Sequence, residues 1–170
     1  MAWTVIPDNV ARCGDDPGPV APGEVLICLV HSKLDIDVGV LFKRETLLPK
    51  KNESFSNVCG ESDGQSVVRR GQLSDQRIFQ MSEDQAAVRP GRTARGARLA
   101  MVDDVRAIGI TAASPSQKVY VYDDPVRPTN PLHAVMRVDG QLAEQSRAEF
   151  DSIRVQIEQA FSTRISLVTP

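Results

Sequence analysis

Two segments of the chain alternate between apolar and polar residues on either side of a proline-rich loop. Residues 118–124 read KVYVYDD, residues 133–140 read HAVMRVDG, and three prolines lie between them. A period of two is typical of strands that bury one face against a core. We therefore predict that the two segments pair as antiparallel strands and bring Asp123 and Asp124 close to His133.

Apolar runs predict the remaining strands. Residues 24–31 form a nearly continuous apolar run rich in β-branched side chains, as expected of a central strand that is buried on both faces. Residues 34–42 alternate, so we expect them to form a hairpin with the preceding run through a short turn. Shorter strands are predicted at residues 3–6, 99–102 and 110–111.

Three segments lack a hydrophobic period and carry glycine or proline among polar residues. Such composition is typical of loops that run over the surface. These segments are residues 8–23, 50–64 and 90–98.

Two short helices are predicted from capping residues. Ser74 or Asp75 provides the side-chain acceptor that a helix N-terminus needs, and the helix is expected to reach Met81. The acidic residues 103–104 precede a single helical turn, which Gly109 is expected to end in the left-handed conformation.

The clearest helix lies near the C-terminus. Residues 141–162 contain neither glycine nor proline and would span about 33 Å as one helix. An apolar face recurs at helical spacing along it. This face consists of Phe150, Ile153, Ile157, Ala160 and Phe161. Residues 164–168 then predict a last strand, so that the tail forms a β-α-β unit.

These elements predict an α+β fold for a single domain over residues 1–170. The sheet is expected to be mixed and largely antiparallel, with one long C-terminal amphipathic helix packed on a face and the β-α-β unit at the end. A chain of this length buries a sizeable core without covalent cross-links. Aromatic residues make up 5% of the chain, so aliphatic side chains must build most of that core.

Composition sets limits on the class of partner. The chain carries 20 basic and 22 acidic residues, a balance that gives no argument for a nucleic acid or an anionic membrane. The longest apolar run, residues 25–30, is far too short to cross a bilayer, and the first residues show no signal-peptide pattern. We expect no membrane partner and no cofactor.

Cysteine usage predicts the compartment. Cys13, Cys28 and Cys59 are widely spaced, odd in number and without a C-x-x-C pair. This pattern predicts neither a disulfide framework nor a zinc site. We therefore expect three free thiols, a cytoplasmic location, and a buried apolar position for Cys28.

The mouth of the proline-rich loop is the best candidate for chemistry. A carboxylate beside an imidazole orients the ring, favours its charged form and suits it to act as a general base. His133 is therefore the candidate catalytic residue, with Asp123 or Asp124 as the orienting acid. The alternative is structural, with His133 bonded to the loop backbone and both acids ending a strand. No G-x-S-x-G motif supplies a nucleophile.

An arginine-rich segment is the candidate anion-binding site. Residues 89–98 read RPGRTARGAR, which places Arg89, Arg92, Arg95 and Arg98 at every third position. Clustered guanidinium groups, with backbone N–H groups near glycine, bind anions well. The alternative is a solvated basic loop that offsets nearby acids.

His31, Asp35 and Asp37 form the third constellation. Two aspartates at this spacing share a strand face and lie about 7 Å apart, which suits a hard cation. The alternative is a solvated outer strand face with a histidine in the turn. We prefer the alternative and predict no metal site, because motifs such as H-E-x-x-H are absent.

Part of the chain resembles a pattern of small uncharacterised bacterial proteins. DDVRAIGI, at residues 103–110, carries a V-R-x-x-G turn, and PVRPTNPLHAV, at residues 125–135, ends in N-P-x-H-A. The resemblance covers about a third of the chain. It implies a bacterial source and no defined activity, and it places Arg106, Asn130 and His133 at matching positions.

Two functions remain in competition. The first is a non-catalytic interaction module that acts through a protein partner, which fits the lack of a complete catalytic motif. The alternative is a small enzyme for a phosphorylated or nucleotide-like substrate, with His133 as base and Arg92 or Arg95 holding the anion. A nucleic-acid partner is disfavoured because base-stacking aromatic residues are missing near the arginines. The ligand classes to test are thus a protein and an anionic small molecule.

Overall fold

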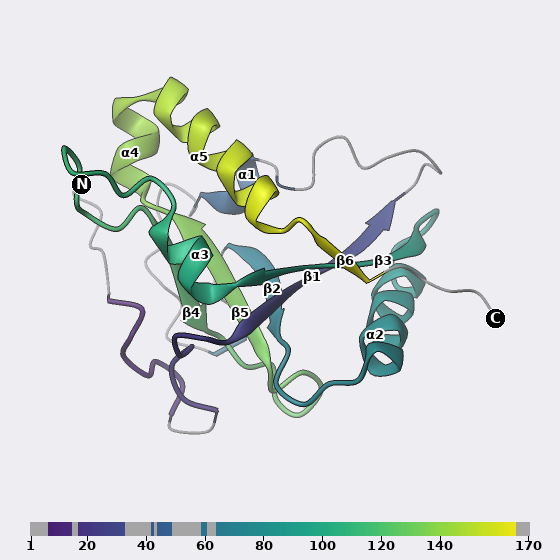
Figure 1. Ribbon diagram of the computed structural model, residues 1–170. Coiled ribbons are helices and arrows are strands. Elements are labelled where there is room, and N and C mark those ends of the chain that lie inside the picture. The colour runs from purple at the N-terminus through teal and green to yellow at the C-terminus, as the bar shows by residue number, and fades with distance from the viewer. Residues whose placement is uncertain are drawn as a thin grey trace.

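A six-stranded antiparallel sheet organises the chain, with the strand order β4-β5-β2-β1-β3-β6 (Figure 1). The computed structural model describes residues 7–14, 17–32, 42, 44–48, 59–60 and 64–165. The strands are β1 (Val25–Ser32), β2 (Gln65–Arg69), β3 (Thr93–Met101), β4 (Val119–Asp123), β5 (His133–Val138) and β6 (Thr163–Ile165). The helices are α1 (Arg44–Leu47), α2 (Asp75–Ala87), α3 (Val102–Ala107), α4 (Gly140–Gln145) and α5 (Arg147–Ala160).

The predicted pairing of the two alternating segments is confirmed. β4 and β5 pair antiparallel, and their register sets Val119 opposite Val138 and Asp123 opposite Ala134. The apolar run that predicted a central strand is β1, which lies between β2 and β3. A strand in that position is covered on both faces, which explains why its apolar residues do not alternate with polar ones.

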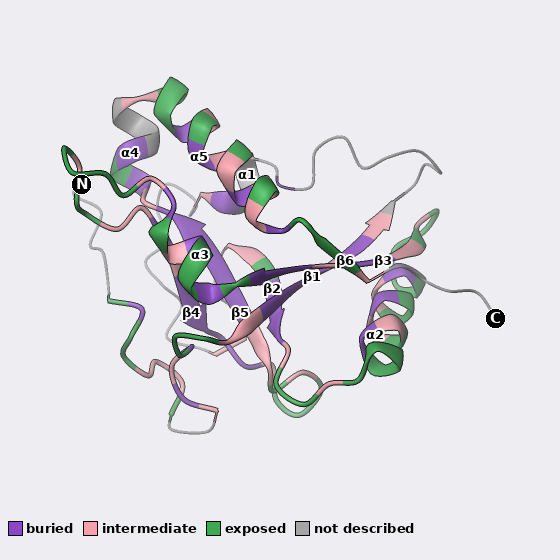
Figure 2. Cartoon of the chain, viewed as in Figure 1, coloured by how far each residue is buried: buried purple, intermediate pink, exposed green. Residues whose placement is uncertain are grey.

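Successive residues of β1 point into two separate cores on opposite faces of the sheet. Leu26 and Cys28 belong to the larger core, beneath α3, α4 and α5, whereas Ile27 belongs to the smaller core under α2. Figure 2 shows buried residues along the strands and along the inner side of α5. The bulkiest fully buried side chains of the larger core include Phe42, Phe150, Phe161, Leu26, Leu47 and Met136.

The single C-terminal helix predicted over residues 141–162 is wrong, because the segment forms two helices. α4 ends and α5 begins at Ser146, whose backbone is extended at φ −150° and ψ 103°. The Ser146 hydroxyl accepts a hydrogen bond from the Glu149 N–H at 3.2 Å and so caps α5. Serine followed three residues later by glutamate is a capping-box pattern. The predicted apolar face is confirmed, since its positions from Phe150 onward are buried or partly buried.

The exposed loop predicted over residues 90–98 is also wrong. β3 begins at Thr93 and pairs with β1 as far as Ser32. The register skips Arg95, which is the extra residue of a β-bulge. The strand therefore continues through a sequence whose arginines and glycine hide its period.

The short helices begin close to their predicted caps. Ser74 caps α2, because its hydroxyl accepts a hydrogen bond from the Arg77 N–H at 3.2 Å. Residues 103–104 lie inside the first turn of α3 rather than before it, where negative charge complements the helix dipole. Gly109 follows α3 with φ 76°, as expected. Residues 110–111 do not rejoin the sheet.

Several predictions fall wholly or partly outside the described residues. They concern the strand at 3–6, the strand at 34–42 except Phe42, most of the loop at 50–64, and the last strand beyond residue 165.

The two strands of the predicted β-α-β unit run in the same direction. β6 pairs antiparallel with β3. Four antiparallel pairings separate β5 from β6 in the sheet, namely β5–β2, β2–β1, β1–β3 and β3–β6. Each pairing reverses the strand direction, so an even number of them leaves β5 and β6 parallel. α4 and α5 thus carry the chain across one face of the sheet from β5 to its far edge (Figure 1).

Phe150→Ala is expected to lower the free energy of unfolding by about 3–5 kcal/mol, because the ring is fully buried and its removal leaves a cavity. Urea denaturation followed by circular dichroism measures the loss. Val155→Ala on the same helix is the matched control, since Val155 is 43% exposed and its truncation should cost less than about 0.5 kcal/mol. Equal, small losses for the two variants would contradict the packing of α5.

Candidate functional site

Asp123 closes β4 and anchors the N-terminal segment. Its carboxylate accepts hydrogen bonds from the backbone N–H of Arg12, at 3.2 Å to each oxygen, and from the backbone N–H of Cys13 at 3.0 Å. Asp123 is only 1% exposed. A buried carboxylate is stable only where donors surround it. These bonds therefore fix an irregular segment to the end of the sheet.

Asp124 lies beside His133, as predicted for the mouth of the loop. Its Oδ2 atom is 3.4 Å from His133 Nδ1, and its backbone oxygen is 2.6 Å from the same nitrogen. A carbonyl oxygen only accepts hydrogen bonds, so Nδ1 carries the hydrogen and Nε2 is the ring nitrogen able to accept one. The other carboxylate oxygen of Asp124 accepts a hydrogen bond from the Gly60 N–H at 3.0 Å.

Both acids thus hold loop backbone, and one of them also orients a histidine. The side chain of His133 is 12% exposed and that of Asp124 is fully buried, so the pair is largely shielded from water. The tautomer suits a general base. The catalytic role of His133, Asp123 and Asp124 stays a prediction.

A disulfide joins the two segments that these acids hold. Cys13 and Cys59 are bonded although they are 46 residues apart in the sequence. The expectation of three free thiols is therefore wrong, because the fold brings together cysteines whose spacing forms no motif. A disulfide persists under oxidising conditions. This bond weighs against the predicted cytoplasmic location, which stays a prediction.

Cys28 is the free cysteine and is buried, as predicted. Burial raises the pKa of its thiol to about 12. The reactive thiolate is therefore scarce at neutral pH, which leaves Cys28 as an apolar core residue.

A buried ion pair covers the outer edge of β4, and no pattern in the sequence indicated it. Asp8 Oδ2 accepts hydrogen bonds from Arg106 Nε at 2.9 Å and from the Val121 N–H at 2.8 Å. Gln117 Nε2 donates to the same oxygen at 3.2 Å. The Asp8 side chain is 6% exposed. Arg106 lies in the V-R-x-x-G motif, which is the signal that could have drawn attention to it.

Basic side chains gather where β1 ends and β3 begins. Arg92 Nη1 is 3.1 Å from His31 Nδ1. A guanidinium group only donates hydrogen bonds, so Nδ1 accepts and the ring is neutral in this geometry. Burial and the positive charges of Arg89 and Arg92 lower the pKa of His31. These three residues are termed the basic cluster below.

Of the other two arginines of the predicted anion-binding set, only Arg98 lies apart from the basic cluster. Arg98 stands opposite Cys28 on one side and Arg164 on the other. Residues opposite each other in neighbouring strands share a sheet face, so Arg98 is on the face of the larger core. By strand alternation His31 is on the opposite face, under α2. Arg95 occupies the bulge, between Ala94, which stands opposite His31, and Gly96, which stands opposite Val30.

Arg69 and Arg70 do not join the basic cluster. Arg69 makes a bidentate ion pair with Glu24, at 2.7 and 2.6 Å, and donates to the Gly18 carbonyl at 2.7 Å. Arg70 pairs with Asp75 at 3.0 Å. Both guanidinium groups are therefore committed to other segments.

The described part of the chain contains no group of three or more His, Cys, Asp or Glu residues placed to hold a metal ion. Asp35 and Asp37 of the third constellation lie outside it, and His31 belongs to the basic cluster. Among the described helices, none combines the length and the apolar character needed to cross a membrane.

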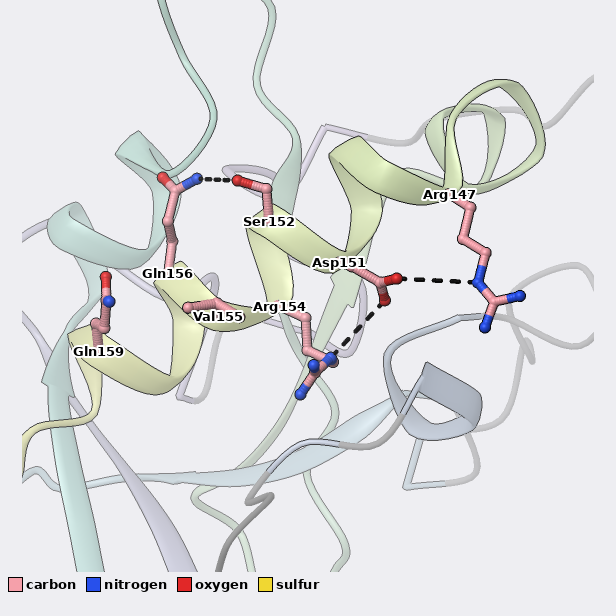
Figure 3. A pocket seen from close by; sticks show the side chains of 7 residues that line it. All are labelled: Arg147, Asp151, Ser152, Arg154, Val155, Gln156 and Gln159. Atoms are coloured by element: carbon pink, nitrogen blue, oxygen red, sulfur yellow. Dashed lines mark hydrogen bonds and ion pairs between the residues drawn. The ribbon is translucent and has the colours of Figure 1, made fainter.

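The outer face of α5 carries a shallow depression of about 760 Å³ (Figure 3). Its side chains pair with one another. Asp151 lies 3.9 Å from Arg147 and 4.0 Å from Arg154, and Gln156 donates to the Ser152 hydroxyl at 3.3 Å. Such pairs at spacings of three and four residues are typical of a solvated helix surface.

Comparison with protein-family models, with curated proteins and with solved structures finds no match for this chain. Inference about function therefore rests on the geometry and charge of the sites themselves.

Thiol titration checks the disulfide. In denaturant without reductant, one thiol per chain should react, because Cys13 and Cys59 are bonded and only Cys28 is free. After reduction the count should rise to three. Three reactive thiols before reduction, in protein purified without reductant, would contradict the bond.

Acidification should destabilise the protein partly through His31. Its folded pKa lies below the ordinary value of 6.5, so the unfolded chain takes up the proton more readily. The stability is thus complete above the unfolded pKa and is lost as pH falls through it toward the folded pKa. His31→Gln should lose less stability than the wild type between pH 7.5 and 5.5 in urea denaturation. Equal losses would show that burial and the two arginines do not lower the pKa of His31.

Proposed function

We propose that the chain is a non-catalytic binding module that holds an acidic segment of a protein partner on the basic cluster. The observation that carries this proposal is that Arg92 Nη1 lies 3.1 Å from His31 Nδ1 and Arg89 acts on the same ring, while neither arginine forms an ion pair with an acid among the described residues. Six other arginines of the described chain do form ion pairs, namely Arg69, Arg70, Arg77, Arg106, Arg147 and Arg154.

Like charges held together favour an anionic ligand. The two guanidinium groups disfavour the charged form of His31. A carboxylate placed between them would relieve the repulsion and accept charge-assisted hydrogen bonds. Such a ligand would also favour protonation of His31 and so recruit a third positive charge.

The cluster is accessible on the turn between α2 and β3. Val88 is 77% exposed on this turn. Gly91 has φ 72°, a conformation that glycine adopts without strain. An exposed apolar residue beside basic groups suits a peptide, which offers both carboxylates and apolar side chains. The net charge of −2 disfavours a nucleic acid.

The position of His133 supports binding rather than catalysis at the cluster. His133 stands opposite Val68 on β2, and Val68 stands opposite Ile27 on β1. His31 is two further side chains along the same face, so the two histidines are about 16 Å apart. One small substrate would not reach both, which weakens the alternative of an enzyme with His133 as base and Arg92 as anion clamp.

Charge reversal at Arg89 and Arg92 tests the proposal. Arg89→Glu combined with Arg92→Glu should weaken binding of a fluorescein-labelled hexaglutamate peptide at least about tenfold, because attraction becomes repulsion at two positions. Fluorescence anisotropy at low salt measures the affinity, which should fall as salt is added.

Arg77→Glu combined with Arg147→Glu is the matched control. It changes the net charge equally at exposed arginines that form only loose ion pairs, at 4.0 and 3.9 Å. The control should bind the peptide nearly as the wild type does, and both variants should keep its melting temperature. Equal weakening by the two variants would reduce the effect to net charge and would contradict a specific site.

A further inference from the structure

β4 is an edge strand of the sheet that the described residues form, and side chains protect its outer side. At the other edge of the described sheet, β6 carries the exposed Arg164, and a charged side chain on an edge discourages pairing with another chain. β4 has the sequence VYVYD, rich in aromatic and β-branched residues that favour strands. An unprotected edge of this kind would pair with any available strand.

Side chains occupy the outward hydrogen-bonding groups of β4. Asp8 accepts from the Val121 N–H at 2.8 Å, and Arg106 Nη2 donates to the Val121 carbonyl at 3.4 Å. Gln117 Nε2 donates to the Val119 carbonyl at 2.8 Å. Asp8 bonds to Val121, and the Arg12 and Cys13 N–H groups bond to Asp123, so residues 8–13, termed the strap, lie along the edge without forming a strand.

The disulfide fixes the end of the strap. Asp123 holds the backbone of Cys13, and Asp124 holds the backbone of Gly60. The Cys13–Cys59 bond joins these two segments across the end of β4. Breaking this bond would leave the strap attached to the edge by noncovalent contacts alone.

The sequence of β4 is complementary to itself. An antiparallel pairing centred on Val121 sets Tyr120 of one chain opposite Tyr122 of the other. The same pairing sets Lys118 opposite Asp124, twice in each dimer, with the Asp124 carboxylate still bonded to His133 and Gly60 of its own chain. Opposite charges and aromatic rings are favourable cross-strand pairs. The outward N–H and carbonyl groups of Val121 would meet those of its own symmetry mate.

We propose that reduction of Cys13–Cys59 releases the strap and lets β4 pair with β4 of a second copy of this chain. A dithiol reductant breaks the S–S bond through a mixed disulfide. The protein gains two electrons and two protons as two thiols, and the reductant becomes a disulfide. The side chains of Arg106 and Gln117 turn away from the edge as the second strand takes their place. This proposal does not rest on the basic cluster.

The mass of the protein with and without a dithiol tests the release. Light scattering after size exclusion should give one chain for the oxidised protein and two for the reduced protein. Cys13→Ser with Cys59→Ser should be dimeric without reductant. A reduced wild type that keeps its circular dichroism spectrum and remains monomeric would overturn the proposal, as would loss of the fold on reduction.

Two further measurements locate the interface. Hydrogen exchange at the Val119 and Asp123 amides should slow at least about tenfold in the dimer, because both face the second strand. Lys118→Glu should weaken the dimer about tenfold by placing like charges opposite Asp124, whereas Arg147→Glu on α5 should not. A dimer without this protection, or one insensitive to Lys118→Glu, would show that β4 is not the interface.

The basic-cluster variant separates this proposal from the binding function. Arg89→Glu with Arg92→Glu should dimerise on reduction as the wild type does. Failure to dimerise in that variant alone would show that the basic cluster forms the dimer contact, which would overturn the edge pairing.

Discussion

The hydrogen bonds of the outermost strand constrain much of this molecule. β4 must satisfy N–H and carbonyl groups on the side that no other strand of the described residues covers. Asp8 takes the Val121 N–H, and a buried carboxylate in turn needs a counter-charge, which Arg106 provides. The position of α3 is thereby coupled to the sheet edge, and an irregular N-terminal segment is held in place without becoming a strand.

Buried charges attach other irregular segments to the sheet in the same way. Arg69, on β2, reaches Glu24 and the Gly18 carbonyl and so fixes the segment that leads into β1. Asp123 and Asp124 hold the two segments that the disulfide joins. Removing one partner of such a contact leaves a buried group without its bonds, which is costly. Charge is therefore used here to position loops around a core that is otherwise aliphatic.

The basic cluster differs from these contacts because its charged groups repel one another, whereas the buried ion pairs attract. His31 and Arg92 meet without a carboxylate in any described ion pair, and the arginines oppose protonation of the ring. An arrangement that is unfavourable within the protein can become favourable when an anion binds. The register separates this cluster from Asp124 and His133, so the structural contacts at the loop mouth and the proposed binding surface can be changed independently.

Elements whose burial repeats at a local period could be predicted from the amino-acid sequence alone. The alternation around residues 118–138 predicted β4 and β5, an apolar run predicted β1, and the spacing from Phe150 onward predicted the buried face of α5. Each of these signals arises because one side of a regular element faces a core. The proximity of Asp124 and His133 followed from the strand pairing and needed no further information.

Contacts between residues far apart in the chain arise only when the chain folds. Asp8 and Arg106 are 98 residues apart, and the two bonded cysteines are 46 apart, so their spacing carries no periodic signal. β2 contributes a central strand with little apolar sequence, and β3 continues through an arginine-rich bulge. Both become strands because neighbouring strands offer hydrogen bonds along their length, a property of the assembled sheet that the local sequence does not contain.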